Sequence, residues 1–299
     1  MTSSIPKLSP AHLHEAHATR DLQDKLLEPI SVLAPFSALI ISITLIVLFM
    51  IRLYLLQGYV MQRFYGRTNR RGFINHHIAG VTKILVLIVA IHAFISVAFG
   101  NSYFHRPYAH GSRVTLGDVL LIACQMLIGM YLFELIYRTK LSPVAVAHHT
   151  GTILIGQSAI ALSLRLDREP DADIEFIMCT VWGAFDITSE VFPHVAIILY
   201  RIYPQRHYFL RNVFLCSCIT TAAGTLCETV VAMWLFGSIW DRWGIAFKVL
   251  TPILHIAFSA AQVHESFCIL EDVQASTGIH QGREGFRGFQ IYYIKRRVV

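Results

Sequence analysis

The chain has 299 residues, of which 55% are hydrophobic and 15% are charged, and its formal net charge is +6. Soluble globular domains carry about 25% charged residues, so this composition argues against a soluble protein. The mean hydropathy of +0.53 and the long apolar runs instead predict a helical protein that crosses a membrane several times. Basic residues collect in the cytosolic loops of such proteins, so the positive charge does not indicate nucleic-acid binding.

Seven apolar segments predict an all-α bundle of about seven transmembrane helices. They cover residues 32–55, 78–100, 115–137, 144–166, 173–200, 210–237 and 245–270. The fifth segment carries acidic residues and scores poorly on hydropathy alone. Short connections between the third and fourth segments, and between the fifth and sixth, predict antiparallel neighbours. We expect one membrane domain over 32–270 that encloses a cavity open to lipid.

The charges of the connecting loops predict the orientation of the bundle. The first, third and fifth connections are basic, whereas the fourth is acidic on balance. Because basic loops stay in the cytosol, we expect 1–31 to be a lumenal N-terminal segment and 271–299 to be a cytosolic basic tail. The first residues lack the apolar core of a cleavable signal peptide. The first span would then direct the chain to its membrane, which we expect to be the endoplasmic reticulum.

Ionisable residues inside apolar segments are rare and by default face the interior of a bundle. This chain has many of them: Glu134, His148, His149, Asp186, Glu190, His194, Glu228, His255, His264 and Glu265. Three of them are spaced i, i+4, i+8 along the fifth segment and form one stripe. The two adjacent histidines, Glu134 and the end of the seventh segment are expected at the same depth, and Glu228 is expected deeper. The sequence therefore predicts a polar cluster in the cytosolic half of the bundle.

A polar cluster of this kind suits acid–base chemistry. A carboxyl group removed from water favours its neutral form, and a neutral carboxyl group can donate a proton. Any one of these residues can instead satisfy an interhelical hydrogen bond, but the stripe and the histidine pair together favour a functional site. We expect no cofactor and no metal. Adjacent histidines diverge by about 100° on a helix, and the sequence has no HExxH motif.

The stretch "LFELIYRTKLSPVAVAHHTGTILIGQSAIAL" resembles the Lag-type core of TLC-domain proteins, which include ceramide synthases and lipid proteins that are not synthases. The matching features are Glu134, the basic loop after it and the "HHTGT" motif. Further on, "DITSE" resembles the "DxxLE" segment of ceramide synthases. The resemblance implies a TLC-like bundle with the two histidines at the mouth of a lipid-sized cavity. Ceramide synthases carry a His-Asp pair where this chain has Trp182 and Gly183, and a lysine where it has Pro193, which argues against ceramide synthesis.

The layout of seven spans, the length and the many intramembrane acids also resemble fungal membrane-bound terpene cyclases of meroterpenoid pathways, of the ascochlorin and macrophorin type. This resemblance implies an isomerase or lyase of secondary metabolism that cyclises a prenylated aromatic or another isoprenoid. Asp186 or Glu190 would protonate an epoxide or olefin, and a histidine or a second carboxylate would remove the final proton. Aromatic faces would stabilise the cation; the candidates are Tyr131, Trp182, Phe185 and Trp234.

Two other functions stay open. One is a TLC-type protein that binds or transports lipid without catalysis, which needs a cavity but no acid. The other is a ceramide-synthase-like acyltransferase with a histidine as base or nucleophile. Every alternative predicts a hydrophobic isoprenoid or lipid partner taken from the bilayer. The predicted catalytic residues are Asp186, Glu190, His148, His149 and Glu134, and the secondary candidates are His194, Glu228, Glu265 and Trp182.

Overall fold

A computed structural model describes residues 31–57, 67–138, 141–163, 172–203, 205–238 and 240–278. The described residues form helices and no strand, so the predicted all-α class is confirmed. The α-helices are α2 (Ser37–Gln57), α4 (Arg67–Ala98), α5 (Leu116–Tyr137), α6 (Pro143–Ser163), α7 (Ala172–Ile202), α8 (His207–Ser238) and α9 (Ile245–Gly278). Two 3-10 turns, η1 (Ala34–Phe36) and η2 (Trp240–Arg242), precede α2 and α9. The predicted lumenal segment, apart from its last residue, lies outside the described residues.

Two helices extend beyond the segments predicted for them. α4 begins at Arg67 rather than at residue 78, and α9 continues to Gly278 rather than ending at 270. Apolar runs mark only the part of a helix that suits the hydrocarbon core, whereas backbone hydrogen bonding continues through polar residues at the ends. Residues 271–278 of the predicted tail are helical as the last part of α9, and 279–299 lie outside the described residues.

Five helices of the described chain, α2, α4, α5, α8 and α9, are long and apolar enough to cross a membrane. The chain is therefore an integral membrane protein. The other two helices, α6 and α7, have 21 and 31 residues. A helix rises about 1.5 Å per residue, so both are long enough for a hydrocarbon core of about 30 Å. Their histidines and acids lower their hydropathy, and their crossing of the membrane stays a prediction.

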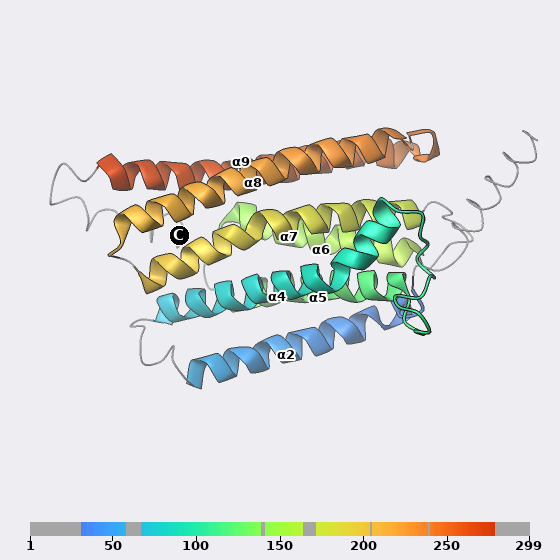
Figure 1. Cartoon of the computed structure of the whole chain (residues 1–299), viewed down its shortest axis with the longest axis horizontal. Coiled ribbons are helices and arrows are strands. Elements are labelled where there is room, and N and C mark those ends of the chain that lie inside the picture. The colour runs from blue at the N-terminus through green and yellow to red at the C-terminus, as the bar shows by residue number, and fades with distance from the viewer. Residues whose placement is uncertain are drawn as a thin grey trace, which may run out of the picture.

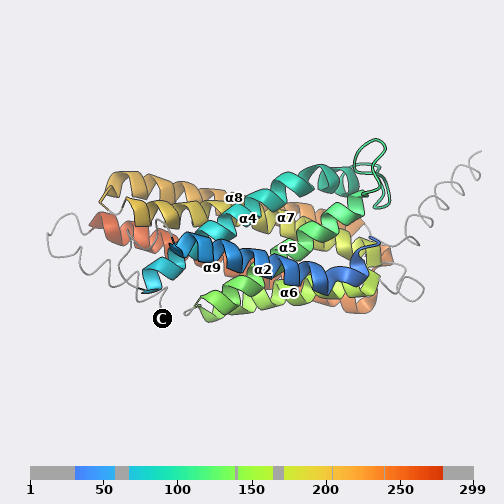
Figure 2. The ribbon, with the colours of Figure 1, turned by 90° about the horizontal axis from the view of Figure 1, so that it is seen from below.

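Helix α7 lies at the centre of the helix packing. It packs against α4, α6 and α8, while α9 packs on α8 and α2 packs on α5. Figure 1 shows α8 and α9 on one side of the bundle, α2 on the opposite side and α4 to α7 between them. Figure 2 shows that the helices follow the long axis of the molecule. The predicted contacts of α5 with α6 and of α7 with α8 are confirmed.

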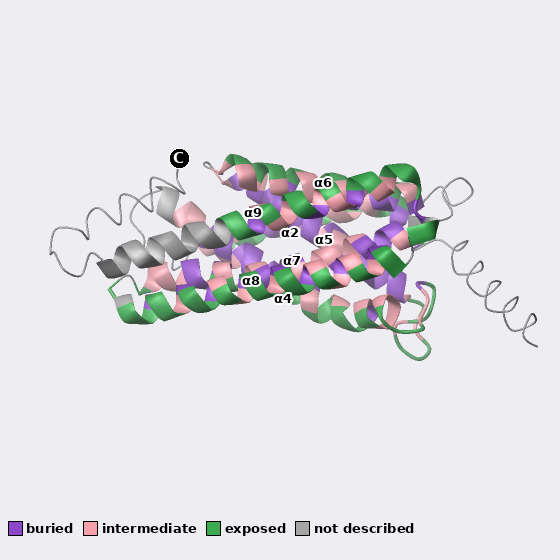
Figure 3. Ribbon diagram, turned by 90° about the horizontal axis from the view of Figure 1, so that it is seen from above, coloured by how far each residue is buried: buried purple, intermediate pink, exposed green. Residues whose placement is uncertain are grey.

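The bundle buries polar side chains and exposes apolar ones. Asn75, Lys83 and Gln125 are fully buried, whereas Ile88 is 64% exposed and Ile256 is 67% exposed. Figure 3 shows that exposed residues follow the outer faces of the helices and buried residues face inward. In water such an apolar surface would favour aggregation. In lipid it is the favourable arrangement, because hydrocarbon solvates the apolar faces and the interior satisfies the polar groups.

A proline and three small residues hold α7 close to α8. Pro193 lies inside α7 and cannot donate a hydrogen bond to the carbonyl four residues earlier, which belongs to Ser189. The hydroxyl of Thr221 on α8 shares its proton between that carbonyl, at 3.1 Å, and the Ser217 carbonyl of its own helix, at 2.9 Å. A Cβ at Gly224 would overlap the Ser189 hydroxyl. Small residues therefore let the two backbones approach closely, as in other membrane helix pairs.

The outward apolar faces lead to a prediction about depth in the bilayer. Ile88 lies towards the middle of α4, and Ile136, which is 65% exposed, lies at the end of α5. We expect Ile88→Arg to raise the apparent insertion free energy of its helix by about 3 kcal/mol, because a charge at the bilayer centre is costly. Ile136→Arg should cost much less, because its side chain can reach the interface. A glycosylation-reporter insertion assay measures both. Equal costs would contradict the central depth that we assign to Ile88.

Candidate functional site

Four helices bring ionisable side chains together in the interior. The ammonium group of Lys83 on α4 donates to Glu190 on α7 and, at 3.5 Å, to the hydroxyl of Tyr131 on α5. That hydroxyl donates to Asp186 on α7. Nε2 of His148 on α6 lies 3.3 Å from Oδ1 of Asp186 and 3.5 Å from Oε1 of Glu190. We call these five residues the charged network.

The charged network places two acids beside a lysine and a histidine, where each can offset the charge of another. A lone buried ion costs several kcal/mol, and a partner offsets part of that cost. The His148 ring is not oriented for a hydrogen bond to either acid, so this contact is electrostatic. Oδ1 of Asp186 consequently has no hydrogen-bond donor within the described ranges. It can accept a proton or a hydrogen bond from a molecule that reaches it.

The second histidine of the pair contacts a different acid. Nε2 of His149 lies 3.2 Å from Oε2 of Glu134, and the other oxygen of Glu134 accepts a hydrogen bond from Asn75. The ring of His149 stacks on Tyr131 with 4.5 Å between the ring centroids. Consecutive helix residues point about 100° apart, so the two histidines of α6 reach two separate acids. Tyr131 contacts both imidazole rings.

The third member of the α7 stripe, His194, also has a separate partner. Its Nδ1 lies 2.9 Å from Nδ1 of His76 on α4, and both rings are buried. A hydrogen bond between two imidazoles needs one N–H donor and one bare nitrogen. At least one of these two rings is therefore neutral.

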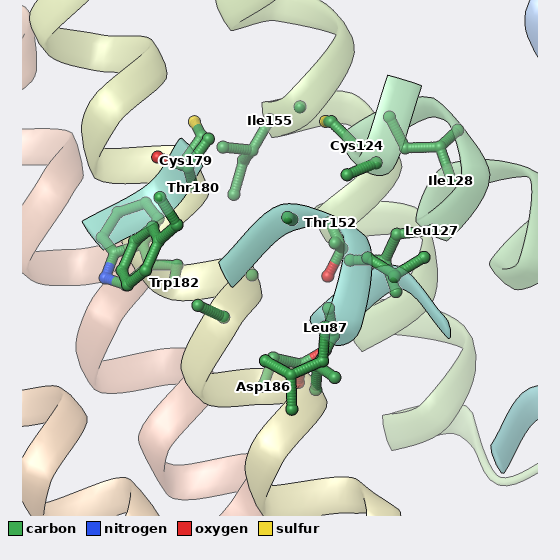
Figure 4. Close-up of a pocket in the computed structure, with 18 of the residues that line it drawn as sticks. Leu87, Cys124, Leu127, Ile128, Thr152, Ile155, Cys179, Thr180, Trp182 and Asp186 are labelled. Carbon is green, nitrogen blue, oxygen red and sulfur yellow. The ribbon is translucent and has the colours of Figure 1, made fainter. Parts of the chain in front are cut away.

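An apolar cavity of about 110 Å³ lies within the bundle and is partly open to the outside. Its walls come from α4 to α9 and are mainly aliphatic and aromatic, with His148 and Asp186 among the polar groups. Figure 4 shows Asp186 and Leu87 at one end of the cavity and Cys124 and Cys179 towards the other. An apolar cavity of about 150 Å³ is known to bind benzene, so this space suits about one ring or one prenyl unit. A longer apolar chain would extend through the opening.

Helices α8 and α9 contribute further polar groups to the apolar cavity. Glu228 is buried, and the side-chain amide of Gln262 donates to it at 3.5 Å. Among the described residues Glu228 forms no ion pair, in contrast to Asp186. The ring of His255 stacks on Trp182 at 6.3 Å between centroids. Nδ1 of His255 and Nε1 of Trp182 are buried without a hydrogen-bond partner in the described part of the chain, so both can bind a polar group of a ligand.

A second cavity, of about 90 Å³, has both ionisable and apolar side chains in its walls, and we call it the polar cavity because its walls are much more polar than those of the apolar cavity. It shares His148 and Gln262 with the apolar cavity. Glu190 lines the polar cavity and Asp186 lines the apolar one. The charged network therefore stands between the two spaces.

One group of side chains has the spacing of a metal site. Ligand atoms of His148, Asp186 and Glu190 lie within 4.8 Å of one another. However, Lys83 already donates to Glu190, and Tyr131 already donates to Asp186. A metal ion would compete with an ammonium group for the same carboxylate. We therefore interpret these contacts as an ion-pair network.

The structure divides the predicted site residues into groups. Of the five predicted catalytic residues, three belong to the charged network: Asp186, Glu190 and His148. The other two form the neighbouring pair of His149 with Glu134. The secondary candidates Glu228 and Trp182 line the apolar cavity, and His194 lines the polar one.

The end of the seventh predicted span does not contribute to the charged network in the described chain. His264 is exposed, and the side chain of Glu265 lies outside the described residues. The apolar span of α9 ends at His264, as expected, although the helix itself continues to Gly278.

Sequence reasoning missed several members of the site. Lys83 could have been found by the rule that selected the acids, because "TKILVLIV" places one lysine in an apolar run. Asn75 and His76 precede the predicted start of their span, so that rule could not select them. Among the proposed aromatic residues, Trp234 is 63% exposed and faces outward, so its predicted role in the cavity is wrong. Phe94 and Phe258 line the cavity instead.

Comparison of the chain with protein-family models, curated proteins and solved structures found no match. The resemblances to TLC-domain proteins and to membrane-bound terpene cyclases therefore remain predictions from the sequence.

The ion pair of the buried Lys83 with the partly buried Glu190 leads to a prediction about stability. We expect Lys83→Met to lower the free energy of unfolding by about 2–3 kcal/mol, because it leaves a partly buried acid without its cation. The double variant Lys83→Met, Glu190→Gln should lose less than the single variant. Thermal unfolding in detergent micelles measures each change. Lys248→Met is the matched control, because the Lys248 ammonium group lies 4.9 Å from the centroid of the Trp240 ring rather than in the network. A single variant no less stable than this control would contradict the role given to Lys83.

Proposed function

We propose that the protein is an integral membrane terpene cyclase that starts cyclisation by protonating a prenylated aromatic or another isoprenoid. One observation carries the proposal: two carboxyl groups with different surroundings, Asp186 and Glu228, line the same apolar cavity. A pair of acids in unlike surroundings is the usual arrangement when one donates a proton and the other accepts it.

The surroundings assign a role to each acid. Asp186 has His148 and Tyr131 beside it, which favours its ionised form. Glu228 is buried at 3% exposure without an ion pair in the described chain, and a buried carboxyl group without a cation is accommodated best when neutral. Glu228 is therefore our candidate for the acid, whereas the sequence alone favoured Asp186 or Glu190. Glu190 lines the polar cavity and would act on the substrate only through the charged network.

The reaction balances without a cofactor. The proton of Glu228 passes to an epoxide oxygen or an olefin carbon, and the cation formed is attacked by the next double bond. A final C–H bond gives its proton to Asp186, and a proton returns to Glu228 before the next turnover. The rings of Trp182 and Phe258 line the cavity and can stabilise the cation through their faces. The apolar walls keep water from the cation.

The TLC-like character of the bundle and its placement are part of this proposal. The basic ends of α4, α5 and α7 carry Arg71, Arg138 and Arg201, and these ends would face the cytosol. The N-terminus would then be lumenal and the C-terminus cytosolic, in the membrane of the endoplasmic reticulum. An isoprenoid dissolved in the bilayer would enter through the open part of the apolar cavity.

A protein that carries lipid without catalysis is the second candidate. The observation that favours it is the cavity itself, which is mainly apolar, partly open and suited to an alkyl chain. The acyltransferase alternative has less support. Trp182 and Gly183, which occupy the positions of the ceramide synthase His-Asp pair, line the cavity and supply no additional base.

The proposed acid and base lead to a prediction about turnover. With an epoxidised prenyl phenol supplied to the reconstituted protein, we expect Glu228→Gln and Asp186→Asn each to lower kcat by about 10²–10⁴-fold. Cyclic product is measured by mass spectrometry. Glu175→Gln is the matched control, because Glu175 is a buried acid of α7 that is not among the residues of the apolar cavity. Full turnover by both cavity variants would reject the mechanism.

A cavity-filling variant tests where the ligand binds. A Cβ at Gly183 would meet only Leu127, at 3.7 Å, and Gly183 lines the apolar cavity. We therefore expect Gly183→Val to fold but to reduce co-purified apolar ligand by about tenfold, since the added methyl groups occupy the cavity. Gly237→Val is the control, because Gly237 is exposed and has no atom within 4 Å of an added Cβ. Native mass spectrometry measures the bound ligand. Equal ligand content in both variants would place the ligand elsewhere.

A further inference from the structure

Two arginines meet one tyrosine ring at the end of the bundle where α2 and α5 finish and α4 begins. The guanidinium carbon of Arg52 on α2 lies 5.1 Å from the centroid of the Tyr137 ring, and that of Arg71 on α4 lies 5.3 Å from it. Tyr137 is the last residue of α5 and is 3% exposed. Both arginines are half-buried. Three helices thus place two cations around one buried phenol.

This arrangement leaves hydrogen-bond donors without acceptors. The Tyr137 hydroxyl and Nε of Arg52 are buried and have no hydrogen-bond partner among the residues that the structure describes. The aromatic face attracts each guanidinium group, but it does not supply the oxygen acceptor that a buried N–H needs. Buried donors of this kind point to a bound water or ion. Two neighbouring cations favour an anion over water.

The segment that joins the two arginines is positively charged and contains no acidic residue. Residues 52–71 contain five arginines and neither Asp nor Glu. The guanidinium group of Arg201 on α7 packs against Gly72, next to Arg71. The acid of α5 closest in sequence, Glu134, already contacts Asn75 and His149.

We propose that Arg52, Arg71 and Tyr137 bind a phosphomonoester group, either free or on a lipid headgroup. A phosphate has enough acceptor oxygens for two guanidinium groups and a phenol together, and planar guanidinium groups bind phosphate well. The site lies at the ends of three membrane helices, where headgroups lie. It does not depend on the proposed cyclase activity, because none of the three residues lines the apolar cavity.

The test uses the full-length protein in maltoside micelles, which contain no phosphate. One arm adds inorganic phosphate at constant ionic strength, and the other adds phosphatidic acid to the micelles. We expect a saturable rise in Tm in at least one arm. Arg52→Gln, Arg71→Gln and Tyr137→Phe should each weaken the Kd by at least about tenfold. Tyr137→Phe keeps the ring and both cation contacts, so it removes only the hydroxyl.

Arg206→Gln is the matched control. The Arg206 guanidinium carbon lies 5.6 Å from the centroid of the exposed Tyr203 ring, so this variant removes one positive charge from a similar contact away from Tyr137. It should leave the Kd unchanged. A response to phosphate alone would identify the free anion as the ligand, and a response to phosphatidic acid alone would identify the headgroup. Absence of saturable binding in both arms would overturn the proposal. So would equal weakening by Arg206→Gln and Arg71→Gln, because it would indicate general attraction to a basic surface.

Discussion

The buried ammonium group of Lys83 is the constraint on which the centre of the bundle depends. It needs an anion in a place that water does not reach, and Glu190 supplies one. This contact fixes α4 against α7, and the hydrogen bonds through Tyr131 and Asp186 extend the constraint to α5. The electrostatic contact between His148 and Asp186 links α6 to α7 as well. The two cavities lie on either side of these contacts, so the same interaction that holds the helices together also separates an apolar space from a polar one.

Other interior contacts serve the same purpose in a bundle whose outer surface is apolar. Lipid removes the hydrophobic drive for helix association, so polar contacts and close packing must supply it. Gln157 donates to Gln125 between α6 and α5, and Thr225 donates to Gln262 between α8 and α9. Gly224 provides close packing between α7 and α8. The polar side chains of the interior therefore hold the helices together, whatever chemistry some of them perform. Only the groups that reach a cavity are candidates for catalysis.

The sequence predicted the helices well because bilayer thickness sets the length of an apolar run. It also predicted the α7 stripe, because the spacing of Asp186, Glu190 and His194 depends on one helix alone. Partners on other helices could not be predicted in this way. Whether His149 faces Glu134 or Asp186 depends on how α6 is rotated against α5 and α7, and a single sequence carries no record of that rotation.

The role proposed for Glu228 could not be predicted from the sequence either, because it depends on residues of other helices. Its expected depth in the membrane was predicted from its position in the sequence, but its lack of an ion pair in the described structure depends on where Lys83 and His148 lie. Charge neighbours decide whether a buried acid holds or releases its proton. The assignment of acid and base therefore required the packed bundle, and it moved the expected proton donor from α7 to α8.

The proline of α7 has a consequence for how this sequence can vary. Pro193 leaves the Ser189 carbonyl without its usual donor within the helix, and the Thr221 hydroxyl of α8 takes that place. If a residue with a backbone N–H replaced the proline, that carbonyl would regain a donor from α7, and the Thr221 hydroxyl would keep only its bond to the Ser217 carbonyl of its own helix, at 2.9 Å. The effects of substitutions at positions 193 and 221 should therefore depend on each other, although the two positions lie on different helices. Substitutions at either position are expected to be tolerated best when the other changes with it.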